Sequence, residues 1–377
     1  MDFDFTDDQA SLRDAVARWV EKGFGFERRH NIAKAGGATR TVYAELAELG
    51  LTGLAVPEAY GGMGFGPVEA MVVMEELGRG LVNAPYAAGA LVAPTLLSAA
   101  PGAVQAAWLP RMASAEVLVV LAHQERVARY RLHHVTTRAT AAGAGHVLTG
   151  AKSVVPAGDE ADAFIVPARW SGADGDAAGI GLFLVERGAS GSTVRAYPTQ
   201  DGARAAELVL AATPAVLLTA EGGALLEQAA DVGIAALCAE AVGLMDRLVA
   251  ITVEYMNTRK QFGATLASFQ ALRHRVADVK MQLELARSMS YFATMKLAEP
   301  APQRRRALSQ AKLQLGNSMR FVGQQCIQLH GGIGVTDEYI ASHYFKRLTV
   351  MEMSFGDTLH HLGEVSARMQ ATAGVFA

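Results

Sequence analysis

The pattern of apolar and polar positions divides the chain into a helical region, a region of strands and a second helical region. Between about residues 6 and 115, apolar side chains recur at the three- and four-residue spacing of amphipathic helices. The first segment begins at Thr6, a capping residue, with acidic residues in the following turn. Two further helices are predicted, TRTVYAELAELGL and GPVEAMVVMEELGRGL, with the Pro/Gly-rich loop VPEAYGGMGFG between them.

Between about residues 118 and 220 the pattern changes to short runs of β-branched and apolar residues. Turns rich in Gly, Asp and Ala separate these runs, which are VLVVLAHQE, HVLTGAKSVVPAG, DAFIVPARW, IGLFLVE and AELVLAA. Short apolar strands separated by turn residues are typical of a small antiparallel barrel or sandwich. An exposed turn is predicted at residues 172–177, GADGDA.

From about residue 222 onward, the sequence predicts three long helices with few breakers. They are GALLEQAADVGIAALCAEAVGLMDRLVAITVEYMNTR, FQALRHRVADVKMQLELARSMSYFATMKLA and a segment from Gln303 to about Leu329. Long helices that are apolar on more than one face pack as a bundle, and the apolar surface left over could contact another subunit. We therefore expect a mostly α fold with an N-terminal helical domain at 1–117, a middle β domain at 118–221 and a C-terminal helical bundle at 222–377.

Composition and charge exclude several classes of protein. Hydrophobic residues make up 51% and charged residues 19%, a globular composition. The near balance of 34 basic and 37 acidic residues predicts neither nucleic-acid nor membrane-surface binding. The start, MDFDFTDDQA, lacks an apolar signal core, and no apolar run reaches the roughly 18 residues of a membrane span, so a cytoplasmic location is expected. Cys238 and Cys326 lie in apolar helical segments, which favours buried thiols over a disulfide or metal site, and no metal is expected.

The first segment that suggests a binding site is NTRKQFGATLASFQ, residues 257–270, between two long helices. Arg259 offers a permanently charged fork suited to phosphate oxygens. Phe262 offers a flat aromatic face, and Gly263 allows close approach of the backbone. Gln270, at the start of the next helix, could bond a ribose or an adenine edge. The alternative interpretation is a basic helix–helix turn with Phe262 in the core.

The second segment is QLHGGIGVTDEY, residues 328–339, where glycines expose the backbone after a long helix. Free N–H groups in such a loop can hold a pyrophosphate or a ring oxygen. The alternative is an ordinary helix C-cap, because glycine is common there. No strand precedes the glycines, so the segment is not a Rossmann fingerprint.

Together the two segments resemble the acyl-CoA dehydrogenase family. The stretches MDFDFTDDQASLRD, LGLTGLAVPEAYGGMGFG and VMEELGR resemble the N-terminal domain of that family, so the resemblance covers the whole chain in order. It implies a C-terminal four-helix bundle, FAD as cofactor, an acyl-CoA substrate and an electron-transfer protein as acceptor. It also implies a dimer of dimers in which neighbouring bundles share each FAD. The cofactor contacts that it implies in the helical bundle are Arg259, Phe262, Gly263, Gln270, Gln328, Gly331 and Gly332.

In the middle domain, the resemblance places a loop and a strand against the flavin ring. The corresponding segments here read AHQERVARYRL and TGAKSVVPAGDEAD, in which Glu125 and Lys152 keep their places. A family tryptophan is replaced by Val154 or Val155, which leaves a thinner wall beside the flavin. Backbone groups of both segments could serve the flavin ring, or the residues could simply belong to strands. On the first interpretation, Glu125 and Ser153 are candidate cofactor residues.

The catalytic carboxylate of the family is missing from its usual place. The family reaction removes the α-proton of an acyl thioester while hydride leaves the β-carbon for the flavin, so a carboxylate must lie over the α-carbon. The usual glutamate falls here on Phe355 or Gly356, and the position used by a second group of members falls on Gly233. Asp357 is the nearest acid and the candidate base, although it could instead cap the helix TLHHLGEVSARM.

The C-terminal pattern SHYFKRL followed by FGD-x-x-HHL resembles the small or partner subunits of heteromeric acyl-CoA dehydrogenases. Known members act on pimeloyl-CoA or on steroid-CoA esters, which would place the chain in lipid or steroid catabolism. The resemblance implies an α2β2 assembly with a homologous subunit that supplies the glutamate. The alternatives are a self-sufficient homotetramer using Asp357 or Glu352, a flavin-free structural partner, and a flavin oxidase or monooxygenase on the same fold.

Overall fold

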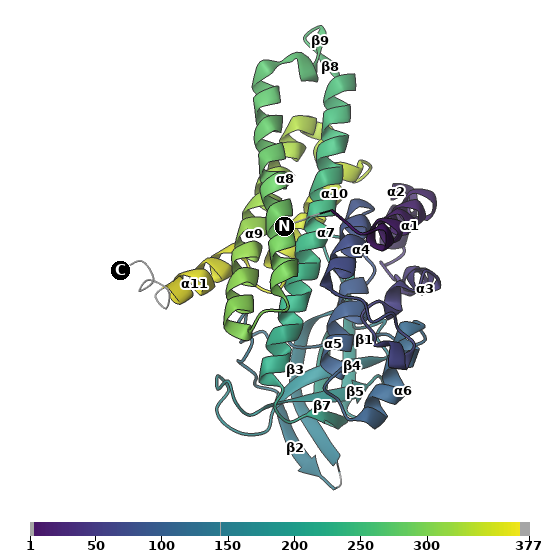
Figure 1. The fold of residues 1–377 in the computed structure, drawn as a ribbon, viewed down its shortest axis with the longest axis vertical. Coiled ribbons are helices and arrows are strands. Elements are labelled where there is room, and N and C mark those ends of the chain that lie inside the picture. Colours follow the sequence, from purple (N-terminus) through teal and green to yellow (C-terminus); the bar gives the residue numbers. More distant parts are fainter. Residues whose placement is uncertain (1–3, 144, 370–377) are drawn as a thin grey trace. The chain divides into compact units, whose positions relative to one another are not determined.

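A computed structural model of the chain describes residues 4–143 and 145–369 (Figure 1). The predicted order of helices, strands and helices is confirmed. The chain forms two compact units, and the N-terminal helical region contributes to both of them. One unit contains Met1–His30, Pro67–Val82 and Ile234–Ala377, and the other contains Asn31–Gly66 and Asn83–Gly233. The domain boundaries expected from the sequence remain predictions.

The first unit is a helical bundle (Figure 1). It contains α7 (Gly223–Thr258) from Ile234 onward and α2 (Phe26–Lys34) as far as His30. Its other helices are α1 (Asp7–Gly23), α4 (Pro67–Arg79), α8 (Gln270–Lys296), α9 (Ala301–His330), α10 (Ile340–Met353) and α11 (Thr358–Met369). Buried aliphatic side chains from α7, α8, α9 and α10 form its core, as the long apolar periods predict.

Two local features explain how α1 begins and how α4 packs against α7. Thr6 and Gln9 form a reciprocal capping box at the start of α1, with N···O distances of 3.1 and 3.2 Å. Further along, Gly78 of α4 faces the backbone of α7, and Gly243 of α7 faces the backbone of α4. A side chain at either glycine would collide with a carbonyl group, so both glycines are needed for this close helix packing.

The second unit is built around a β-barrel. Its strands are β1 (Val119–Leu121), β2 (Arg138–Ala142), β3 (Gly145–Pro156), β4 (Ala163–Arg169), β5 (Ile180–Glu186), β6 (Ser192–Pro198) and β7 (Arg204–Thr219). The pairings run from β4 to β5, β7, β3, β2 and back to β4, which closes the sheet, while β6 pairs with β7 outside this ring. Closure leaves fewer open edges for wrong pairing.

The barrel differs from the expected antiparallel arrangement because β1 and β2 both pair in parallel with β4. Sequence reasoning also missed β2 and β6, whose residues are mostly exposed or small and give no continuous apolar run. Helices α3 (Arg40–Glu48), α5 (Ala93–Leu97) and α6 (Gly102–Ala113) complete this unit and share its apolar cores with the strands.

The two cysteines are free and buried, as their apolar surroundings predicted. Burial raises the pKa of the Cys238 thiol to about 12 and that of the Cys326 thiol to about 11, so both remain protonated and unreactive at neutral pH. Within the described ranges, no helix combines the length and the apolar character that crossing a membrane requires.

Candidate functional site

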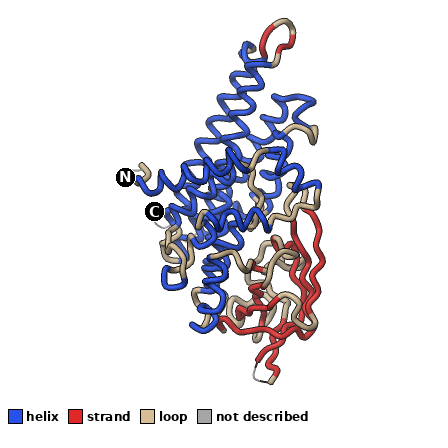
Figure 2. The backbone as a smooth tube through the Cα atoms, turned by 90° about the vertical axis from the view of Figure 1, so that its right-hand side faces the viewer, coloured by secondary structure: helices blue, strands red, loops and turns tan. Residues whose placement is uncertain are grey.

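The segment that joins α7 to α8 is a β-hairpin, where the sequence predicted a loop (Figures 1 and 2). Strand β8 (Lys260–Gln261) pairs with β9 (Ala264–Thr265) through a two-residue turn at Phe262 and Gly263. The φ angles of these two residues are 53° and 78°, the combination that a type I′ turn requires. For phenylalanine this conformation costs about 1–2 kcal/mol.

The hairpin presents Phe262 to solvent, with 95% of its surface exposed. The alternative in which this ring fills the core is therefore wrong. Arg259 and Gln270 are exposed on either side of the hairpin, and Gln270 is the first residue of α8, as predicted. A strained turn that holds an aromatic ring in water indicates a binding role, because the strain and the exposure both oppose stability.

The glycine-rich segment lies at the same end of the bundle. It begins in the last turn of α9, at the buried residue His330. The ring of His330 lies 4.7 Å from the ring of Tyr255, which is in the last turn of α7, four residues before Arg259. His330 Nδ1 bonds the carbonyl of Cys326 at 2.8 Å, and the hydroxyl of Tyr339 lies 3.3 Å from Nε2. Burial lowers the pKa of His330, so the imidazole is neutral and anchors the segment.

The backbone that follows His330 is exposed to solvent. Gly331 is the C-cap of α9, with φ of 65°, so the ordinary capping role is confirmed at this glycine. Gly331 and Gly332 are also exposed, and a Cβ atom at either would meet no atom within 4 Å. The side chain of Gln328 is exposed one turn earlier.

These groups match the chemistry of a dinucleotide. A guanidinium, an aromatic ring, two carboxamides and the exposed backbone of two glycines lie at one end of the bundle, and the structure gives the Arg259 guanidinium no partner among the described residues. A guanidinium and peptide N–H groups suit a pyrophosphate, while a flat ring and carboxamides suit an adenosine. The residues at this end therefore fit the ADP half of FAD.

The turn between α10 and α11 occupies the expected place of the catalytic carboxylate. Phe355 has φ of 56° and packs its ring against the bundle core. Gly356 has φ of 111° and is buried, and a Cβ atom there would lie 2.5 Å from the ring of His360 and 2.7 Å from that of His361. In this conformation the turn has no space for a glutamate at position 356.

The two acids closest to this turn both cap α11. Asp357 Oδ1 accepts the backbone N–H of His360 at 2.8 Å, the N-cap geometry that the sequence allowed as an alternative to a base. Glu352 Oε1 accepts the N–H and the hydroxyl of Thr358 at 3.0 and 2.5 Å and lies 3.3 Å from Arg320. Both carboxylates therefore have structural partners in this chain.

A buried lysine that sequence reasoning missed holds the turn in place. The ammonium group of Lys312 on α9 donates to the carbonyls of Met351, Glu352 and Gly356 at 2.8–3.1 Å. Burial lowers the pKa of Lys312 to about 8. Its sequence context, AKLQLG, is an ordinary helical run, so nothing local distinguishes this lysine from an exposed one.

His361 closes the same turn. Its ring is buried, and Nε2 lies 3.0 Å from the carbonyl of Phe355. Burial lowers the pKa of His361 to about 3, so the ring stays neutral at physiological pH and acts as a fixed packing group.

In the barrel, Glu125 and Lys152 form a buried ion pair at 2.6 Å. The carboxylate also accepts the N–H and hydroxyl groups of Thr136 and Thr137 at 2.5–3.1 Å. Burial alone would raise the pKa of Glu125, but Lys152 and Thr136 outweigh it and lower the pKa to about 2. Both carboxylate oxygens are thus bonded within the barrel, which leaves the neighbouring backbone as the part of this segment that can meet a ligand.

The other candidate of the barrel, Ser153, is buried, and its N–H donates to the carbonyl of Gln124 at 2.8 Å. This bond joins the two segments that the sequence places against the flavin. Of the two valines at the family tryptophan position, Val155 is in the core and Val154 is exposed. The structure thus leaves Val154 as the side chain of this pair that can meet a ligand.

Arg169, which sequence reasoning also missed, fixes the loop that precedes β2. Its buried guanidinium donates to carbonyls on both sides of the predicted turn at 172–177 and to His133 and Val135. The turn is confirmed and exposed, and it wraps around the guanidinium. Because Thr136 and Thr137 follow directly, Arg169 also supports the threonines that bond Glu125.

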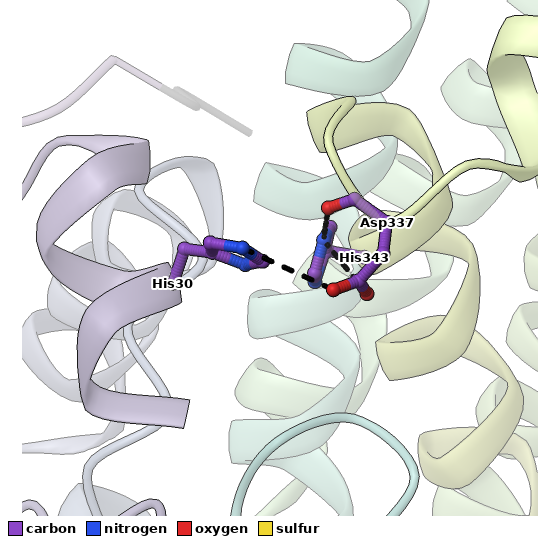
Figure 3. Close-up of side chains that lie close together, drawn as sticks. All are labelled: His30, Asp337 and His343. Atoms are coloured by element: carbon purple, nitrogen blue, oxygen red, sulfur yellow. Dashed lines mark hydrogen bonds and ion pairs between the residues drawn. The ribbon is translucent and has the colours of Figure 1, made fainter. Parts of the chain in front are cut away.

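His30, Asp337 and His343 form a group of metal-ligating residue types in the described part of the bundle (Figure 3). The contacts argue against a metal. His343 Nδ1 lies 2.9 Å from the buried guanidinium of Arg29, and Nε2 lies 2.8 Å from the carbonyl of Asp337. Lys346 pairs with the Asp337 carboxylate at 3.1 Å. Both ring nitrogens of His343 are engaged and two cations lie beside the group, so it is a structural link between α2 and α10.

Comparison with known proteins agrees with this geometry. The chain matches the acyl-CoA dehydrogenase N-terminal, middle and C-terminal domain families over residues 6–116, 120–212 and 221–370. It is 30% identical to the acyl-CoA dehydrogenase IpdE2 of Mycobacterium tuberculosis, with 90% of this chain and 91% of the relative covered.

Solved structures show the same similarity. The Tcur3481-Tcur3483 steroid ACAD G363A variant is 28% identical, with a TM-score of 0.89 over 98% of this chain and 99% of the other. Butyryl-CoA dehydrogenase from Megasphaera elsdenii is 25% identical, with a TM-score of 0.87 over 98% and 100%. The chain is therefore an FAD-dependent oxidoreductase of the acyl-CoA dehydrogenase family.

Proposed function

We propose that this chain is the subunit of a heteromeric acyl-CoA dehydrogenase that binds FAD but supplies no catalytic carboxylate. The observation that carries the proposal is the turn at residues 354–357. Phe355 and Gly356 stand at the family position of the base, and the turn has no room for a larger side chain at Gly356. The nearby acids, Asp357 and Glu352, cap α11. A homologous partner subunit provides the glutamate that removes the α-proton.

Bound FAD supplies the hydride acceptor, and this chain supplies groups that hold it. Arg259 pairs with the pyrophosphate across the subunit interface, and Phe262, Gly263 and Gln270 flank the adenosine half. The carboxamide of Gln328 and the exposed backbone of Gly331 and Gly332 add further contacts to the same half. In the barrel, the backbone around Glu125 and at residues 153–155 meets the flavin ring.

The exposed surface of the bundle supports an assembly of several subunits. A fully exposed Phe262 at a strained hairpin tip is stabilised when another chain covers it. Several apolar side chains of α8 are exposed as well, and others line a groove with α9 together with the polar side chains of Gln310, Gln314 and Asn317. The exposed or groove-lining apolar side chains are Met281, Leu285, Met289, Phe292, Met295 and, from α9, Leu313.

The substrate that we propose is a steroid-type acyl-CoA ester. The support is the C-terminal sequence pattern and the similarity to a structure described as a steroid acyl-CoA dehydrogenase. Pimeloyl-CoA is the alternative that the same sequence pattern allows.

Asp357→Asn tests the proposal directly. Asparagine caps a helix about as well as aspartate and cannot accept a proton, so the rate of acyl-CoA dehydrogenation by the assembled enzyme is expected to stay within about twofold of the original. Asp357→Ala should lower the free energy of unfolding by about 1 kcal/mol through loss of the cap, again with little change in rate. A fall of about a hundredfold or more for Asp357→Asn would make Asp357 the base and the chain self-sufficient.

Arg259→Ala tests the cofactor role. Loss of a bidentate, charge-assisted contact with phosphate is expected to raise the dissociation constant for FAD about a hundredfold. The measurement is titration of the apoprotein with FAD, followed by flavin fluorescence. Lys280→Ala, which removes an exposed charge from α8, is the matched control and should leave the affinity unchanged. If Arg259→Ala binds FAD with unchanged affinity, the pyrophosphate is not held at the hairpin. If the unaltered chain takes up no FAD, the result favours the alternative of a flavin-free structural partner.

A further inference from the structure

Strand β3 carries a β-bulge at the segment assigned to the flavin. It pairs with β7 at Lys152 and again at Val155, and the register shifts between them. The two intervening residues, Ser153 and Val154, therefore lie opposite Glu207 alone. Two residues facing one is the geometry of a β-bulge, a feature that re-aims side chains and is frequent beside functional sites.

The bulge is strained and open to solvent. Val154 has φ of 52°, a left-handed conformation that is an outlier for a β-branched residue. Its side chain is 47% exposed, so burial of Val154 offsets only part of the strain. A conformation of this kind persists only where neighbouring groups hold it.

Glu207 and Tyr197 are those neighbours. One oxygen of Glu207 accepts the hydroxyl of Ser153 at 3.1 Å, and the other accepts the hydroxyl of Tyr197 at 3.3 Å. The Tyr197 hydroxyl also faces the backbone N–H of Val154, which lowers the pKa of this phenol, although burial raises it by more. Glu207 thus contacts both residues of the bulge, Ser153 directly and Val154 through Tyr197.

The contacts also join three parts of the barrel. Tyr197 lies on β6 and Glu207 on β7, which pairs with β6 along one edge and with β3 along the other. Arg126, in the loop after β1, lies 3.4 Å from the same oxygen of Glu207 that Tyr197 bonds. A single carboxylate therefore connects β3, β6 and the loop of Glu125 at the two segments assigned to the flavin.

We propose that Glu207, acting with Tyr197, is a positioning residue for the cofactor. It holds the backbone of Val154 in the strained conformation in which the bulge meets the flavin ring. The inference rests on the proposed function, which assigns residues 153–155 to the flavin. Neither residue touches reacting atoms, so their effect is on how tightly the flavin is held and in which electronic environment.

The test compares Glu207→Gln and Tyr197→Phe with the unaltered chain in the flavin-loaded assembly. Each variant is expected to bind FAD about threefold to tenfold more weakly, the effect of one or two weakened hydrogen bonds. The visible absorption and circular dichroism bands of the flavin and its reduction potential should shift, because the bulge is no longer held against the ring. Glu186→Gln, an exposed glutamate at the end of β5, is the control and should change none of these.

A second variant separates positioning from general stability. Glycine adopts positive φ without strain, so Val154→Gly in the Glu207→Gln background is expected to return FAD affinity to within about twofold of the original. Flavin bands and affinity that are unchanged by Glu207→Gln overturn this inference and leave the proposed function standing. Failure of Val154→Gly to restore the affinity also overturns it. Absence of flavin from the unaltered assembly overturns the proposed function and this inference together.

Discussion

Assembly with a homologous subunit that carries the glutamate is expected to raise the rate of acyl-CoA dehydrogenation at least about a hundredfold over that of the FAD-loaded chain alone. A correctly placed general base contributes about 10²–10⁴ in rate, and in this chain the acids closest to the family position cap a helix. The measurement is acceptor reduction by the isolated and the co-expressed proteins, at equal flavin concentration and with the same acyl-CoA ester.

The control for this experiment lies in the partner. Replacing the partner's catalytic glutamate with glutamine should return the rate to that of the isolated chain while leaving the flavin bound. Full turnover by the isolated chain would contradict the division of labour and point to a homotetramer with its own base. A co-expressed assembly whose rate does not depend on the partner's glutamate would contradict it equally.

Lys152→Met is expected to lower the free energy of unfolding by about 3–5 kcal/mol at neutral pH. The substitution leaves the carboxylate of Glu125 charged at a site where it is only 2% exposed, and an uncompensated buried charge carries a penalty of this size. Urea unfolding at pH 7, followed by circular dichroism, measures the difference. The flavin content should fall as well, because the 124–126 and 153–155 segments lose a common anchor.

The double variant Glu125→Gln/Lys152→Met is the matched control. It removes both charges and keeps similar volumes, so it should recover most of the lost stability. If the double variant is as unstable as Lys152→Met, the loss comes from packing and not from the unpaired carboxylate.

The same ion pair predicts an acid-sensitive stability. The pKa of Glu125 is about 2 in the folded chain, below the value of roughly 4.3 for an unfolded glutamate. The contribution of the pair is therefore complete above pH of about 4.5 and is lost as the pH falls toward 2. The double variant should lack this part of the acid dependence.

The element order followed from the sequence because it rests on short-range periodicity. Helical spacing of apolar residues identified α1, α3, α4 and the long bundle helices, and Thr6 marked the start of the first helix. Strands with continuous apolar runs were found for the same reason. Strands β2 and β6 were missed because their own residues are mostly polar or small. They are strands because β2 pairs with β3 and β6 pairs with β7.

The candidate binding segments stood out in the sequence, because their residue types suit a dinucleotide. Arg259, Phe262 and Gly263 were predicted to lie in a loop, yet this loop is a hairpin whose turn depends on the positive φ of Phe262. Gln270 begins the next helix, as predicted. The exposure of that ring could not be predicted, since an isolated phenylalanine between two helices is equally suited to a core.

The sequence by itself determined the order of helices, strands and helices, and it predicted the residues suited to a dinucleotide and the lack of a glutamate at the family's catalytic position. The tertiary structure decided the roles of individual charged groups. Lys312 holds the turn that contains Gly356, Glu125 pairs with Lys152, and Glu207 accepts the hydroxyl of Ser153 in the bulge of β3. The physical reason is that periodicity and capping act over a few residues, whereas a buried charge is satisfied by partners that only folding brings within hydrogen-bonding distance.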